Sequence, residues 1–128
     1  WTYVEHDSKK MDQHLQELPL QIRVYEITGP LFFGAADAIE HIIVKEFTTC
    51  LILRMRSVPA LDSTALNALT DLVNFCKKKN ITVIFSHVNE QPMKVLRKSK
   101  FIEIVGEENF CPNIKAALKR AETIIENE

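Results

Sequence analysis

The feature that most constrains the fold is an apolar strand followed closely by an amphipathic helix. The run Cys50–Met55 is nearly all apolar, which is typical of a central strand covered on both faces. After a loop that contains Pro59, apolar residues recur with helical spacing at Ala65, Leu69 and Leu72. A strand that is buried on both faces requires helices on both sides of its sheet, so this unit predicts a layered α/β domain.

The polar residues Asp62, Ser63 and Thr64 stand at the junction of that strand and helix. Free backbone N–H groups and the helix dipole favour a side-chain oxygen at a helix N-terminus, so one of the three caps the helix whatever the protein does. A hydroxyl that became a phosphate would be stabilised at the same place. The residues therefore support two interpretations: a helix cap alone, or a phosphorylation or anion-binding turn.

The rest of the hydrophobic pattern alternates between strands and helices. Strands are predicted for residues 20–28, 31–33, 50–56 and 81–85. Helices are predicted for residues 35–46, 63–79 and 91–98, and from Pro112 to the end of the chain. The apolar residues within 101–105 are predicted as one more short strand, and Tyr3 and Val4 as a candidate edge strand. The order predicts a mixed, mainly parallel sheet of four to five strands with about four helices packed around it.

Length and composition predict one folded domain with little bulk charge. The chain has 128 residues, of which 46% are hydrophobic and 26% are charged, and its net charge of −1 argues against nucleic-acid binding. Residues 1–19 are mostly polar and are interpreted as a linker or lead-in, with the domain over residues 20–126. No apolar run approaches the length of a membrane span. Because the sequence begins with Trp1, we expect it to be a piece of a longer protein.

The motifs of common enzymes and metal sites are absent from the sequence. There is no phosphate-binding glycine loop, no GxSxG nucleophile motif and no HExxH or CxxC spacing. Asp62 and Ser63 are adjacent, so they cannot flank a histidine as a catalytic triad requires. The three cysteines, at 50, 76 and 111, are interpreted as reduced thiols, with Cys50 and Cys76 in the core. We therefore expect no enzyme activity, no cofactor and no metal.

Two segments resemble the STAS domain, which occurs in sulfate transporters and in anti-sigma factor antagonists. The first is the apolar strand, short loop, Asp62-Ser63-Thr64 and following helix; the second is the run Ile27–Ala36, which resembles the transporter branch. The resemblance covers residues 20–126 and implies the same α/β fold. In the antagonist branch the serine after the aspartate is phosphorylated, which corresponds to Ser63. The pattern Asp-Ser-x-Gly of that branch ends here in Ala65, which favours the transporter branch.

The resemblance implies a non-catalytic regulatory and protein-interaction domain of a bacterial sulfate or anion transporter of the sulfate permease family. Such a domain would lie on the cytoplasmic face of the inner membrane, with the transmembrane portion and a soluble cytoplasmic protein as partners. The alternative is a free-standing antagonist-type module that is switched by phosphorylation of Ser63. Weak nucleotide binding at the Ser63 turn is a third hypothesis.

Two groups of basic residues have both a binding and a structural interpretation. Arg54 and Arg56, close to the Asp62 turn in sequence, either counter a phosphate or are simply solvated. A second group either faces an anionic membrane leaflet or forms a solvated helix face. It consists of Lys94, Arg97, Lys98 and Lys100.

Overall fold

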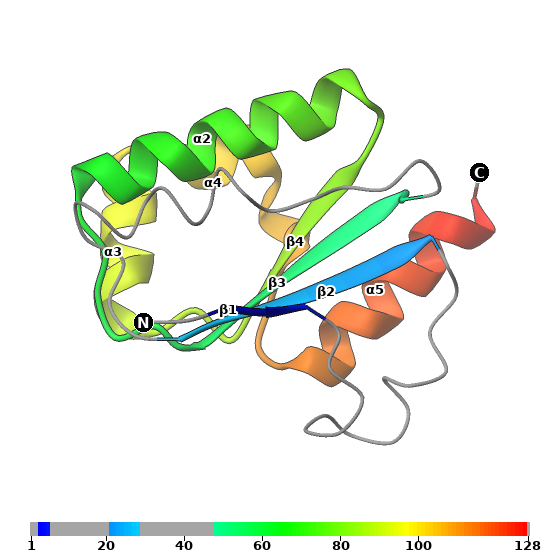
Figure 1. Cartoon of the computed structure of the whole chain (residues 1–128), viewed down its shortest axis with the longest axis horizontal. Helices are drawn as coiled ribbons and strands as arrows, with labels where there is room; N and C mark the ends of the chain where they lie inside the picture. Colours follow the sequence, from blue (N-terminus) through cyan, green and yellow to red (C-terminus); the bar gives the residue numbers. More distant parts are fainter. Residues whose placement is uncertain (1–2, 6–20, 29–47, 128) are drawn as a thin grey trace.

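The computed structural model describes residues 3–5, 21–28 and 48–127, in which five strands form one sheet (Figure 1). The strands are β1 (Tyr3–Glu5), β2 (Ile22–Thr28), β3 (Cys50–Ser57), β4 (Thr82–Ser86) and β5 (Phe110–Cys111). They lie side by side in that order; β1 is antiparallel to β2, and every other pair is parallel. The prediction of a mixed, mainly parallel sheet is confirmed.

Helices cover both faces of this sheet (Figure 1). The helices are α2 (Ser63–Lys78), α3 (Glu90–Lys98), α4 (Phe101–Val105) and α5 (Ile114–Glu126), with a short 3-10 helix, η2, at Glu107–Asn109. Helices α2, α3 and α4 lie on one face, and α5 lies on the other. The predicted strand at 31–33 and helix at 35–46 fall outside the described residues. β1 confirms the edge strand expected at Tyr3 and Val4, whereas the division between lead-in and domain stays a prediction.

Two local predictions near the end of the chain are wrong. Residues 101–105 form helix α4 rather than a strand, because Phe101 and Val105, one helical turn apart, both pack against the core. The short strand lies instead at Phe110–Cys111. The last helix begins at Ile114 rather than at Pro112, because the Asn113 side chain accepts a hydrogen bond from the Ala116 N–H at 2.8 Å and caps the helix.

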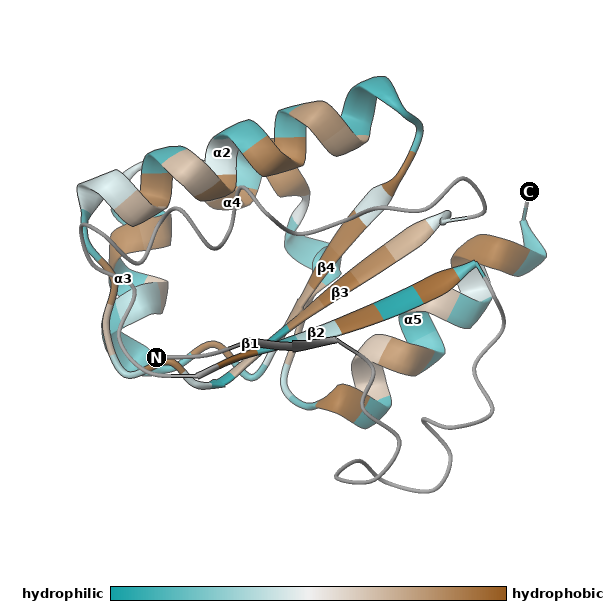
Figure 2. Cartoon of the chain, in the orientation of Figure 1, coloured by the Kyte–Doolittle hydropathy of each residue, from teal (hydrophilic) through white to brown (hydrophobic). Residues whose placement is uncertain are grey.

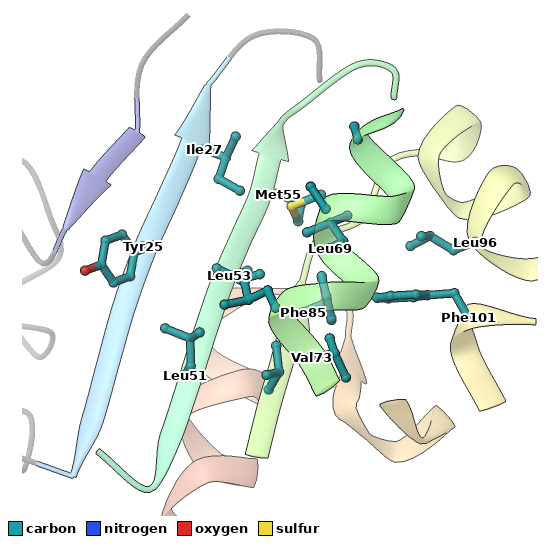
Figure 3. Packing of buried hydrophobic residues seen from close by; sticks show 14 of the residues in the cluster. Tyr25, Ile27, Leu51, Leu53, Met55, Leu69, Val73, Phe85, Leu96 and Phe101 are labelled. Atoms are coloured by element: carbon teal, nitrogen blue, oxygen red, sulfur yellow. The ribbon is translucent and has the colours of Figure 1, made fainter. Parts of the chain in front are cut away.

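The alternation of side chains along the strands creates two hydrophobic clusters, one on each face of the sheet. The cluster beneath α2, α3 and α4 is shown in Figure 3, and its strand residues are Tyr25, Ile27, Leu51, Leu53, Met55, Val83 and Phe85. The strand residues of the cluster beneath α5 are Ile22, Val24, Cys50, Ile52 and Ile84. Figure 2 shows β3 and β4 as mostly hydrophobic, whereas the helices alternate between hydrophobic and hydrophilic positions. Cys50 and Cys76 are buried, as predicted.

Candidate functional site

Asp62, Ser63 and Thr64 lie in the turn between β3 and α2, and each has a different structural role. Asp62 is the N-cap: its backbone is extended, and its Oδ1 accepts a hydrogen bond from the Ala65 N–H at 3.0 Å. Ser63 is the first residue of the helix and is exposed, and Thr64 is half-buried. Within the described part of the chain, the Ser63 hydroxyl makes no hydrogen bond. The helix is therefore capped without Ser63, whose hydroxyl faces solvent at the positive end of the helix dipole.

The loop that leads into this turn is held by two side-chain amides from the start of α3, which we call the amide clamp. Asn89 Nδ2 donates hydrogen bonds to the carbonyl oxygens of Arg56 at 3.1 Å and Val58 at 2.9 Å. The Leu61 N–H donates to Gln91 Oε1 at 3.0 Å, and Gln91 Nε2 donates to the Leu61 carbonyl at 3.4 Å. Two side chains thus satisfy four backbone groups, one at the end of β3 and three in the loop that follows it.

The amide clamp could not be found by sequence reasoning. Asn89 and Gln91 lie about thirty residues from the groups that they bind, and both also fit the start of an ordinary helix. Asn89 is the N-cap residue of α3, but its side chain makes no capping hydrogen bond. The side chain of Asn89 binds the loop after β3 instead of capping α3, and this can be recognised only when β3 and β4 are known to be neighbours.

Arg54 and Arg56 are paired with Glu26 on the neighbouring strand β2. Arg56 Nε lies 3.0 Å from Glu26 Oε2, and Arg54 NH1 lies 3.8 Å from Glu26 Oε1. Arg54 is only 7% exposed, so its interpretation as a solvated side chain is wrong. The parallel register places Glu26 directly opposite Arg54, which explains how the buried guanidinium is compensated.

The basic residues of α3 (Glu90–Lys98), and Lys100 just after it, are exposed. Lys94, Arg97, Lys98 and Lys100 are all exposed, whereas Pro92 and Leu96 are the buried residues of the helix. Lys94 Nζ lies 3.5 Å from Glu90 Oε1, one helical turn away, in a fully solvated pair. This arrangement suits a solvated helix face; contact with a membrane leaflet stays a prediction.

An open hollow of about 400 Å³ lies beside the amide clamp. It is lined by Pro59 from the β3–α2 loop and by Asn89, Glu90, Gln91 and Lys94 from the start of α3. Within residues 3–5, 21–28 and 48–127, no three His, Cys, Asp or Glu side chains gather as a metal site would require. None of the helices described is long and apolar enough to cross a membrane.

The sequence model of the STAS domain matches residues 16–117, most of the chain. The chain belongs to the STAS domain family. YvdB of Bacillus subtilis (strain 168), described as a sulfate transporter, is 30% identical over 92 residues, which are 70% of this chain and 17% of YvdB. The bicarbonate transporter BicA of Synechocystis sp. (strain ATCC 27184 / PCC 6803 / Kazusa) is 28% identical over 79% of this chain and 18% of its own length. The chain thus spans less than a fifth of the length of these two relatives.

Several solved structures match the fold closely. A sulfate transporter family protein from Wolinella succinogenes is 36% identical with a TM-score of 0.79, covering 85% of this chain and 91% of its own. The STAS domain of a SulP transporter from Vibrio cholerae is 34% identical with a TM-score of 0.75, covering 87% and 88%. A Thermotoga maritima protein described as an anti-sigma factor antagonist shares the fold at 15% identity, with a TM-score of 0.69 over 80% of this chain and 89% of its own. The predicted family and fold are confirmed.

Proposed function

We propose that this STAS domain is the non-catalytic regulatory and protein-interaction domain of a bacterial sulfate or anion transporter, positioned on the cytoplasmic face of the membrane. The observation that carries the proposal is the likeness to the SulP transporter STAS domain, at 34% identity over 87% of this chain. The exposed Ser63 turn and the adjacent open hollow give the domain an accessible face suited to protein contact. Regulation through such a face requires binding and no covalent chemistry.

Uptake of labelled anions by cells that express the full-length parent protein tests this function. We expect uptake of sulfate or bicarbonate, with a rate that changes when residues 16–117 are removed. The amount of protein in the membrane is measured in both cases, so that loss of expression is separated from loss of regulation. A parent without membrane-spanning segments, or an uptake rate that is indifferent to the deletion, would contradict the proposal.

One observation favours a second candidate, a free-standing module switched by phosphorylation. Ser63 is exposed and is not needed as the cap, so a kinase can reach its hydroxyl. Against this, Ala65 is fully buried in the first turn of α2, where the antagonist pattern has glycine. Incubation with a matched kinase and ATP, followed by mass spectrometry of the domain and of Ser63→Ala, decides between the two. Titration calorimetry with GTP and ATP tests the remaining hypothesis of weak nucleotide binding.

A further inference from the structure

We propose that an open hollow formed by α3, α4, η2 and β5 binds a small organic molecule that has a flat apolar body and carries one cationic and one anionic group apart from each other. We call this hollow the mixed-charge hollow. Its volume is about 410 Å³, and it shares no lining residue with the Ser63 turn or the amide clamp. Sites for small molecules usually have volumes of about 300–1,000 Å³. A small ligand at this place is not required by the function proposed above.

Four charged side chains line the mixed-charge hollow. Arg97 lies near the end of α3 and Lys100 follows that helix, whereas Glu103 lies on α4 and Glu107 begins η2. All four are exposed, and within the described part of the chain none of these side chains makes an ion pair or a hydrogen bond. The two basic and the two acidic groups are therefore too far apart to neutralise each other directly. A ligand with separated opposite charges can interact favourably with both pairs, which a singly charged molecule cannot do.

The hollow beside the amide clamp differs in this respect. Its two charged side chains, Glu90 and Lys94, already pair with each other at 3.5 Å. A charged ligand there would have to compete with an existing ion pair. Charge complementarity therefore favours the mixed-charge hollow as the ligand site.

The apolar part of the mixed-charge hollow is formed by Met93, Ile102 and Phe110, each of them half-buried. The Phe110 ring is stacked on Phe85, with the ring centroids 5.1 Å apart and the planes at 7°. Phe101 packs edge-on against both rings, at 5.6 Å from Phe85 and 6.5 Å from Phe110 (Phe85 and Phe101 are labelled in Figure 3). Because Phe85 and Phe101 are buried, they hold Phe110 in a fixed orientation. A flat apolar group thus meets a surface that is already ordered, which lowers the entropic cost of binding.

The segment that carries the two acidic residues is also held in place. Gly106 lies between Glu103 and Glu107, and its φ of +106° is a conformation that other residues rarely adopt. Asn109, buried at the end of η2, donates a hydrogen bond from Nδ2 to the carbonyl of the last residue of α4 at 3.0 Å. Its Oδ1 accepts a hydrogen bond from Arg120 Nε on α5 at 3.1 Å. These contacts fix the turn that brings both carboxylates to the same hollow.

Lys100 has a backbone conformation that is unusual for lysine. Its φ of 65° and ψ of 18° lie in the left-handed region, which glycine adopts most easily. Glycine is the common residue at this position after a helix. A lysine here strains the backbone, and its side chain lines the mixed-charge hollow. Replacing Lys100 by glycine should therefore relieve the backbone while it removes a charge from the hollow, so binding can be separated from stability.

Titration of the 128-residue chain with three matched probes, followed by NMR, tests the proposal. The dipolar probe, para-aminomethylbenzoate, carries an ammonium and a carboxylate at opposite ends of one ring, and para-methylbenzoate and para-methylbenzylamine each keep one of these charges. We expect the methyl signals of Met93 and Ile102 to shift with millimolar affinity, as is usual for molecules of this size, and the Ile124 methyl signals on α5 to stay unchanged. The dipolar probe should bind about fivefold more tightly than either analogue. Equal affinity for all three probes, or no shift at Met93 and Ile102, would overturn the proposal.

Charge variants test which side chains bind each end of the probe. Lys100→Gly should weaken binding of the dipolar probe and of the carboxylate analogue by about threefold, but not binding of the amine; Glu107→Gln should weaken binding of the dipolar probe and the amine instead. The control Lys98→Gln removes an exposed charge of α3 outside the hollow and should change no affinity. The melting temperature of Lys100→Gly should be equal to that of the unmodified chain or higher, and Lys100→Asn, which also tolerates the left-handed backbone, should bind as weakly. Unchanged binding in both Lys100 variants, or equal weakening in Lys98→Gln, would refute the role of Lys100.

Discussion

At the scale of single residues, burial changes the chemistry of Cys76. Burial raises the pKa of its thiol from 9.0 to about 11, because the thiolate is disfavoured in the core. The unfolded chain loses this proton first, so the stability that the neutral thiol contributes is complete below pH 9 and is lost as the pH rises towards 11. We expect unfolding free energies from urea titrations to fall by about 1.4 kcal/mol per pH unit in that window. In Cys76→Ala, the unfolding free energy should fall less steeply with pH in this window. An equally steep fall in the variant would show that Cys76 is not the cause.

At the scale of elements, the long helices and strands could be predicted from the hydrophobic pattern, whereas the short elements near the end of the chain could not. Helix α2 and strands β2, β3 and β4 carry enough periodic residues to identify their type from sequence. The strand predicted within residues 101–105 was wrong, and the strand at 110–111 was not predicted, because Phe101 and Phe110 are placed by contacts with Phe85, which is remote in sequence. At the candidate site, the position of the turn was predictable. Which of Asp62 and Ser63 caps the helix could not be predicted from sequence. The amide clamp could not be predicted either, because it depends on the three-dimensional arrangement of β3, β4 and α3.

The amide clamp joins the β3–α2 loop to the start of α3, so its removal should loosen that loop. Gln91→Leu leaves the Leu61 N–H and carbonyl without protein partners, and we expect a loss of about 1 kcal/mol of unfolding free energy. Exchange of the Leu61 amide, followed by NMR, should accelerate in this variant. The matched control is Glu90→Ala, which removes an exposed ion pair but no hydrogen bond to the loop, and should leave the exchange of the Leu61 amide unchanged. Equal acceleration in both variants would show that the clamp does not hold the loop.

At the scale of the whole molecule, the two hydrophobic clusters share the strands β2, β3 and β4, so we expect both to be lost in one cooperative transition. The chain carries a thiol probe for each face: Cys50 lies on β3 and packs beneath α5, and Cys76 lies on the buried side of α2. Pulsed thiol labelling of two variants that retain one cysteine each, across a urea gradient, should give coincident midpoints. Labelling of Cys50 at clearly lower urea than Cys76 would show that α5 detaches first.

The edge strands of the sheet have a consequence for behaviour at high concentration. β1 has 3 residues and β5 has 2, so each outer edge offers few free backbone groups in register. A long, flat edge strand would act as a template for adding a strand from another chain, the first step of edge-to-edge aggregation. Strands as short as β1 and β5 are poor templates, so copies of the domain that are held close together have little tendency to polymerise through these two strands.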